Sequence, residues 1–193
     1  MSGRIIVAGI DASLASTGIA VATLTDGMLD PLTRKVVTTG HNGATLLQRA
    51  ARLDRITSHI LDTIPAAAAL VVIEGPSYAS AKEVAGQRHD RSGLWWQVVH
   101  ALLAADLPVT EVAPTSRAKY ATGSGAAGKD AVLAAAVKRY PAWDITGNDV
   151  ADAVIIAAMG CRHLGHPIDQ LPQVHLAAMT KVHWPATESG ATA

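Results

Sequence analysis

The sequence contains no phenylalanine, and aromatic residues make up only 4% of its 193 positions. Because the apolar share is nevertheless 49%, the core must be built from Ala, Val, Leu and Ile. A chain of this length and composition can form one globular domain, or one domain followed by a tail. Lys and Arg together number 16, as do Asp and Glu, so any basic surface for a nucleic acid has to be local.

Cysteine is almost absent as well. Cys161 is the single cysteine, which excludes an internal disulfide and a cysteine-rich zinc site. No apolar run reaches the ~18 residues of a membrane-spanning helix, and the first residues do not form a charged segment followed by a signal-like apolar stretch. We therefore expect a cytoplasmic protein with no membrane partner.

Apolar periodicity predicts the secondary structure. Three runs separated by short turns favour an antiparallel meander over 5–10, 18–24 and 33–39. Further strands are predicted over 70–73 and 108–112, and helices over 44–64, 93–105, 129–140 and 149–164. This order indicates an α/β fold with a mixed five-stranded sheet, three antiparallel strands and then parallel ones, flanked by helices.

The composition changes near residue 165, where the apolar pattern ends and prolines become frequent. We expect residues 1–165 to form the domain. Residues 166–193 are predicted to be a C-terminal extension that is partly irregular or disordered.

Carboxylates end two of the predicted central strands. Asp11 follows the first apolar run, and Glu74 follows the run before Gly75-Pro76. Neighbouring parallel strands would bring these two side chains together. Asp149 and Asp152 open the last long helix, and their spacing of three places both on one face.

Four carboxylates without a required Cys or His suit a hard cation such as Mg²⁺ or Mn²⁺. Two such ions can activate a water and stabilise the leaving oxygen in phosphodiester cleavage. Each acid also has a structural alternative: Asp11 could cap a turn, Glu74 could pair with an arginine, and Asp149 could belong to a capping box. Their joint arrangement favours catalysis.

Two basic segments accompany these acids. Arg117 and Lys119 precede a glycine loop that contains Ser124, and Lys129 begins the next helix; backbone N–H groups and cations there can hold phosphates. The segment after Glu74 carries a second set, Tyr78, Lys82 and Arg88, in which the aromatic ring could stack on a base. Ordinary solvated surface is the alternative for both segments.

Four ordered motifs resemble the RuvC family of Holliday junction resolvases, in the RNase H and retroviral integrase superfamily. These are GIDASLASTG (9–18), VVIEGPSY (71–78), ATGSGAAGKDAV (121–132) and NDVADAVIIAA (148–158). The resemblance implies an RNase H-like fold and a Mg²⁺-dependent endonuclease, with Mn²⁺ as a substitute. The four acids would be the catalytic metal ligands, and Lys129 would contact a phosphate.

The resemblance also implies a homodimer that nicks branched DNA symmetrically in recombination or repair, because resolving a four-way junction requires two equivalent sites. The apolar helix around Trp95 and Trp96 is our candidate interface. The alternatives are a related nuclease acting on flaps, forks or RNA/DNA hybrids, and a module that binds branched DNA without cutting it.

Overall fold

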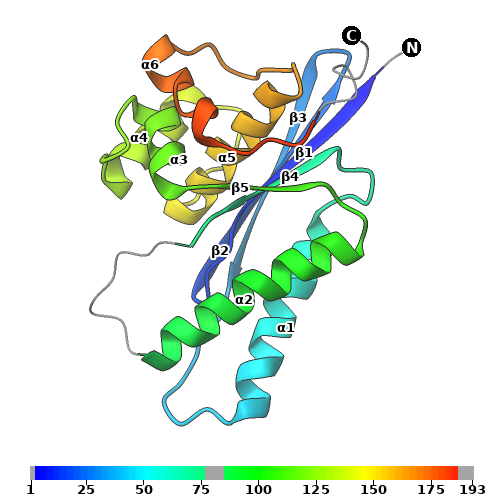
Figure 1. The fold of residues 1–193 in the computed structure, drawn as a ribbon, viewed down its shortest axis with the longest axis vertical. Coiled ribbons are helices and arrows are strands. Elements are labelled where there is room, and N and C mark those ends of the chain that lie inside the picture. Colours follow the sequence, from blue (N-terminus) through cyan, green and yellow to red (C-terminus); the bar gives the residue numbers. More distant parts are fainter. Residues whose placement is uncertain (1–2, 77–84, 187–193) are drawn as a thin grey trace.

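The computed structural model describes residues 3–76 and 85–186. A five-stranded sheet crosses the middle of the molecule in the order β3-β2-β1-β4-β5 (Figure 1). Antiparallel pairing joins β1 to β2 and β2 to β3, whereas β1, β4 and β5 run parallel. The mixed five-stranded sheet predicted from the sequence, with three antiparallel strands and then parallel ones, is confirmed. The strands are β1 (Arg4–Asp11), β2 (Ser16–Thr25), β3 (Met28–Val37), β4 (Leu70–Glu74) and β5 (Val109–Val112).

Helices cover both faces of the sheet (Figure 1). One face carries α1 (Leu46–Thr63) and α2 (Ala85–Ala104), and the other carries α3 (Pro114–Thr122), α4 (Lys129–Arg139) and α5 (Asn148–His163). Short elements follow in α6 (Gln173–Leu176) and η1 (Met179–Lys181). In the described ranges, no helix has the length and apolarity needed to cross a bilayer.

Side chains of each central strand alternate between two apolar cores, as the pleat requires. In β1, Val7 packs toward α5, whereas Ile6 and Ile10 pack toward α1 and α2. In β4, Leu70 and Val72 face α5, whereas Val71 and Ile73 face the opposite layer. The alternation continues to the end of each strand, so Asp11, four residues after Val7, and Glu74, two residues after Val72, belong to the rows that face α5.

The sequence predicted α1, α4 and α5 to within two residues, but α3 was not predicted. The sequence places Arg117 and Lys119 in a basic segment before the glycine loop, but residues 114–122 form a helix. Pro114 occupies the start of α3, where its missing N–H is not needed, and Gly123 ends it with φ of 85°. Helix α2 also begins eight residues earlier than predicted.

The segment after α5, which the structure describes through residue 186, packs on the same core as the rest of the domain. Ala178 is fully buried, and the Trp184 ring stacks on His163 with centroids 4.7 Å apart. The Thr110 hydroxyl on β5 donates to the carbonyl of His183 at 2.8 Å. The expected disorder over residues 188–193 lies outside the described residues.

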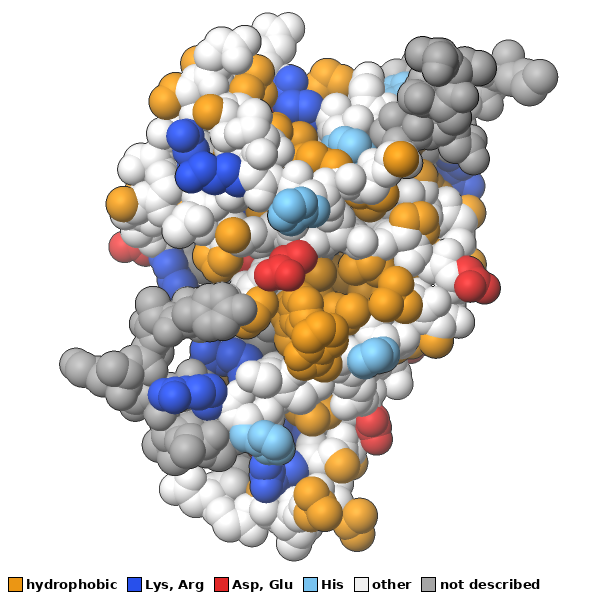
Figure 2. Space-filling view, viewed as in Figure 1, with side chains coloured by type: hydrophobic (Ala, Val, Ile, Leu, Met, Phe, Trp, Pro, Cys, Tyr) orange, Lys and Arg blue, Asp and Glu red, His pale blue; other side chains and the backbone are white. Residues whose placement is uncertain are grey.

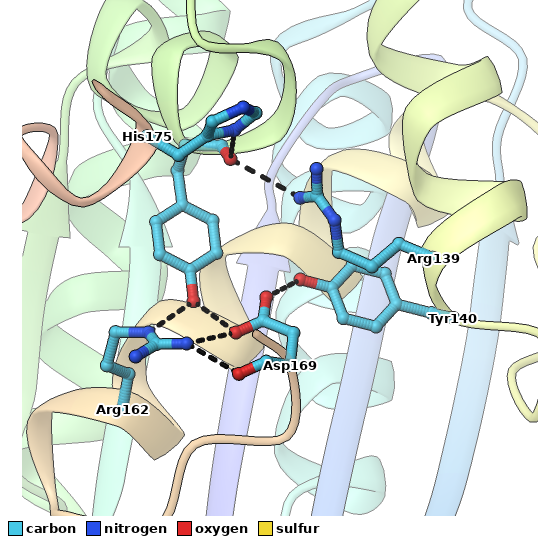
Figure 3. Close-up of polar contacts among 6 residues, drawn as sticks. Arg139, Tyr140, Arg162, Asp169 and His175 are labelled. Carbon is cyan, nitrogen blue, oxygen red and sulfur yellow. Dashed lines mark hydrogen bonds and ion pairs between the residues drawn. The ribbon is translucent and has the colours of Figure 1, made fainter. Parts of the chain in front are cut away.

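A buried carboxylate ties this segment to three helices (Figure 3). The Asp169 side chain accepts from the hydroxyls of Tyr120 at 3.0 Å and Tyr140 at 2.5 Å, and it pairs with Arg162 at 2.5 Å. His175 lies 2.8 Å from the Tyr120 carbonyl oxygen. Burial, followed by the Asp169 charge, raises the pKa of both tyrosines, so both hydroxyls remain donors at neutral pH. These bonds connect helix α3, through Tyr120, to Arg162 on α5 and to the segment that contains Asp169.

Candidate active site

Two acids meet where β1 and β4 end. Ile10 pairs with Ile73 in the parallel register, so the next residues, Asp11 and Glu74, lie side by side at the carboxyl edge of the sheet. Both side chains are on the α5 face. Glu74 is only 8% exposed, and Asp11 is half-buried.

Helix α5 approaches this edge unusually closely because glycines line its path. A Cβ on Gly9 would lie 2.1 Å from the carbonyl oxygen of Ala153, and a Cβ on Gly18 would lie 2.0 Å from the carbonyl oxygen of Asp149. The backbone of α5 therefore rests directly on β1 and β2. This contact brings the first turns of α5 beside Asp11.

The structure assembles three of the four predicted acids into one cluster. Asp11, Glu74 and Asp152 each have a carboxylate oxygen within 4.8 Å of the others. Asp152 is 4% exposed. Asp149 is half-buried and is not part of this group, but its charge contributes to the raised pKa of Asp11 and of Asp152.

An arginine lies within this acidic cluster. Arg117, on α3, donates through Nε and Nη2 to Glu74 Oε1 at 3.0 and 2.8 Å. Its Nη1 lies 2.8 Å from Asp152 Oδ1. The guanidinium is buried and joins a strand-end acid to a helix acid. The sequence places Arg117 in a DNA-binding segment and gives pairing with an arginine as the structural alternative for Glu74. That pairing is present, with Arg117 as the partner, whereas the bond from Arg117 to Asp152 is not predicted from the sequence.

Burial dominates the electrostatics of the cluster. It raises the pKa of Asp11 well above the ordinary value, and the charges of Glu74, Asp152 and Asp149 add to that effect. Burial likewise raises the pKa of Asp152 to about 7, although Arg117 opposes the shift. Negative charge therefore exceeds what one guanidinium neutralises.

A second unforeseen contact fixes Glu74 from the opposite layer. The indole Nε1 of Trp95, on α2, donates to the backbone carbonyl of Glu74 at 2.8 Å. Trp95 is half-buried, as expected for an aromatic residue whose polar atom has a partner. The carboxyl end of β4 is thus held by α2 through its backbone and by α3 through its side chain.

Solved structures share this arrangement of elements. RuvC of Thermus thermophilus matches with a TM-score of 0.61 and 21% identity over 84% of this chain and 98% of that one. A fowlpox virus resolvase in complex with Holliday junction DNA matches with a TM-score of 0.53 and 11% identity, over 83% of this chain and 99% of that one. The yeast mitochondrial Holliday junction resolvase Ydc2 matches with a TM-score of 0.51 and 12% identity, over 78% of this chain and 75% of that one. No protein-family model and no curated protein matches the sequence.

The chain has an RNase H-like fold of the RuvC type. Identities of 11–21% establish the fold alone. The chemistry of the site therefore has to be inferred from the side chains of this protein.

The acids of this RuvC-type fold fit a divalent cation. Three carboxylates at close range form an oxygen-only donor set, which suits Mg²⁺ or Mn²⁺. Arg117 bonds to one oxygen of Glu74 and one of Asp152, so the second oxygen of each carboxylate remains available as a ligand. Burial, with the charges of neighbouring carboxylates adding to it, raises the pKa of Asp11 and of Asp152, and a cation at the cluster would favour the ionised form of both.

The predicted DNA-binding residues occupy different places around the RuvC-type fold. Lys129 is exposed at the start of α4, and its charge acts on Asp152. Lys119 is half-buried on α3, and Ser124 is exposed in the turn after it. Arg88 is exposed on α2, whereas Tyr78 and Lys82 lie outside the described residues. Their contacts with DNA stay predictions.

Proposed function

We propose that this protein is a divalent-metal-dependent endonuclease that resolves Holliday junctions by nicking two strands symmetrically, in cytoplasmic DNA recombination or repair. The observation that carries the proposal is the cluster of Asp11, Glu74 and Asp152 within 4.8 Å at the carboxyl edge of the sheet. Support comes from the fold, because the similar structures include resolvases bound to junction DNA.

The acidic side chains and Arg117 would have different roles in the reaction. Asp11, Glu74 and Asp152, with Asp149 beside them, would hold Mg²⁺, for which Mn²⁺ can substitute. When bound, such ions activate a water and stabilise the leaving oxygen of a phosphodiester, in a two-ion reaction that leaves a 5′-phosphate and a 3′-hydroxyl. Arg117 keeps Glu74 and Asp152 oriented.

The basic residues next to this cluster would position the substrate. Lys129 stands at the exposed start of α4, where a lysine and the helix N-terminus can hold a phosphate together. Lys119 and Ser124 flank the same glycine turn. Phosphate contacts of this kind fix the register of DNA on a protein without reading its sequence.

A homodimer would supply the two sites that symmetric nicking requires. Trp96 is 56% exposed and Leu103 is 53% exposed on the same helix, α2. Figure 2 shows hydrophobic side chains gathered over the middle of this face. Large aromatic and aliphatic side chains are what the core of a protein interface uses. We place the dimer contact on α2, and Trp96→Ser should shift the protein toward monomer in analytical ultracentrifugation.

Cleavage of labelled substrates tests the function. Four-way DNA, forks, flaps, linear duplex and RNA/DNA hybrid are compared with Mg²⁺, with EDTA and with Asp11→Asn; Asp106→Asn, an exposed site remote from the cluster, is the control. We expect paired nicks in the four-way junction that EDTA and Asp11→Asn abolish. Preference for flaps, forks or hybrids would overturn the substrate, and junction binding without cleavage would identify a binding module.

A further inference from the structure

A cleft of about 700 Å³ opens on the side of the sheet that carries α1 and α2. Its walls are the turn after β1, the segment between β3 and α1, the first half of α1 and part of α2. Residues 13–15 line it, and they follow Asp11 within four positions. The cleft therefore borders the turn that follows Asp11, on the face of the sheet opposite to the one that the acids occupy.

Arginines dominate the charge of this cleft. Arg49, Arg52 and Arg55 recur every three residues along α1, and Arg91 faces them from α2. Asp90 is the one acid among the described lining residues, so positive charge exceeds negative by three. The first turn of α1 contains no acidic residue, so the positive end of the helix dipole is not offset there.

The floor of the cleft is built and held by Arg52. Its Nη2 donates to the carbonyl of Leu14 at 2.6 Å and to that of Thr38 at 3.0 Å, while its Nε donates to the Thr38 hydroxyl at 2.9 Å. Gly40 makes room for it, because a Cβ there would lie 2.2 Å from the guanidinium. Arg52 thus fixes the turn after Asp11 to the segment after β3. Its Nε and Nη2 donors are already engaged by acceptors within the protein.

Arg49 and Arg55, the other two arginines of α1 that line the cleft, differ in their hydrogen bonds and ion pairs. Arg49 forms a two-pronged ion pair with Asp90 across α1 and α2. Arg55 is exposed, and among the described residues no hydrogen bond or ion pair engages its guanidinium. Figure 2 shows Lys and Arg side chains near the start of α2 on this face. Arg55 is therefore a cation that lines a cleft with its donors available for a ligand.

We propose that this cleft seats the phosphodiester backbone of a DNA arm that leaves the active site past residues 13–15, with Arg55 contacting a phosphate. The inference rests on the proposed function, which assigns the acids and the residues around the glycine loop but none of these arginines. A guanidinium presents a fork of donors that matches phosphate, and neutralising a phosphate releases counterions. The cleft is bordered by the turn that directly follows the strand carrying Asp11, which favours DNA over an acidic protein.

Binding of a fluorescein-labelled four-way DNA junction tests the cleft without cleavage. Anisotropy is measured with Ca²⁺ replacing Mg²⁺, at 50 and 200 mM salt, for the wild type, Arg55→Gln and Lys138→Gln. Lys138 is an exposed cation on α4, on the opposite layer, and serves as the charge-matched control. Each phosphate contact makes affinity fall about 3.5-fold more between these salt concentrations, so Arg55→Gln should lose that portion of the salt dependence. Lys138→Gln should match the wild type.

A second variant moves the affinity in the opposite direction. Asp90→Asn removes the acid of the cleft and leaves Arg49 available, so the junction should bind more tightly at 50 mM salt and with a steeper salt dependence. A merely structural role of the Arg49–Asp90 pair would weaken binding or leave it unchanged. The two variants together therefore separate a charge effect from a loss of folding.

The outcomes distinguish this inference from the proposed function. If the wild type binds the junction and both variants match Lys138→Gln, the cleft does not hold DNA although the proposed function stands. If the wild type binds no branched DNA, the proposed function fails and the cleft proposal fails with it. Weaker binding by Arg55→Gln together with tighter binding by Asp90→Asn supports the assignment.

Discussion

Replacing Asp152 with Asn should stabilise the metal-free protein while removing a proposed catalytic ligand. Burial holds the pKa of Asp152 at about 7 instead of 3.8, so the folded protein binds a proton more tightly than the unfolded chain between these values. Stability must then fall as the pH rises from about 4 to about 7. Asparagine remains neutral and keeps an Oδ1 that can accept from Arg117, so it avoids this loss.

The magnitude follows from the shift in pKa. Each pKa unit corresponds to about 1.36 kcal/mol, so the displacement of Asp152 sets an upper bound of about 4 kcal/mol at pH 8. We expect Asp152→Asn to gain between about 1 and 4 kcal/mol there. For a domain of this size the midpoint of thermal unfolding would rise by at least about 3 °C.

The assay is thermal and urea unfolding in EDTA at pH 5, 6, 7 and 8, for the wild type, Asp152→Asn and Asp106→Asn. Asp106 is exposed and has φ of 56°, a conformation that asparagine tolerates, so its variant controls for loss of one charge. The gap between Asp152→Asn and the wild type should widen with pH. A gap that stays constant from pH 5 to pH 8, or a variant less stable than the wild type at pH 8, would refute the reasoning.

Three further predictions concern how the site is held. Arg117→Met leaves two buried carboxylates without their guanidinium, and urea unfolding in EDTA at pH 8 should show a loss of about 3 kcal/mol or more; a loss below about 1 kcal/mol would contradict the pairing. Gly9→Ala forces a Cβ against the α5 backbone and should destabilise by about 3 kcal/mol, whereas Gly3→Ala, with open space around it, should be neutral in the same unfolding assay. Asp169→Asn weakens the charge-assisted bonds behind α3 and should reduce stability by about 1–3 kcal/mol, with faster amide hydrogen exchange in α3; unchanged exchange there would show that the carboxylate does not hold the helix.

The acids at strand ends could be predicted because strand order and apolar runs are local features of a sequence. Asp11 and Glu74 each end an apolar strand, and parallel register then places them together. Asp152 could be predicted from its helix spacing. The close packing that brings α5 onto β1 depends on Gly9 and Gly18, whose partners lie far along the chain, so the sequence alone does not reveal it.

The positions of two arginines, Arg117 and Arg55, could not be predicted from the sequence pattern. Basic residues near glycines indicate a phosphate-binding segment. The same segment contains a short helix, which Pro114 at its start and Gly123 at its end could have indicated. The burial of Arg117 could not be inferred, because hydrophobic periodicity is silent about which charged residue a helix turns inward. Arg55 occupies a polar position in the helical pattern of α1, and only the packing of α1 against the segment after β3 makes it line a cleft.

The distribution of the acidic cluster along the chain has a consequence for synthesis. Asp11 belongs to the first strand, whereas Asp152 belongs to the last long helix of the described chain. Ribosomes add about 5–20 residues each second, so the strands emerge many seconds before α5. Until that helix docks, the nascent chain has only part of its carboxylate cluster. The proposed nuclease would acquire its complete acidic cluster only after α5 has been translated and has docked, because contacts between residues far apart in the sequence complete the site.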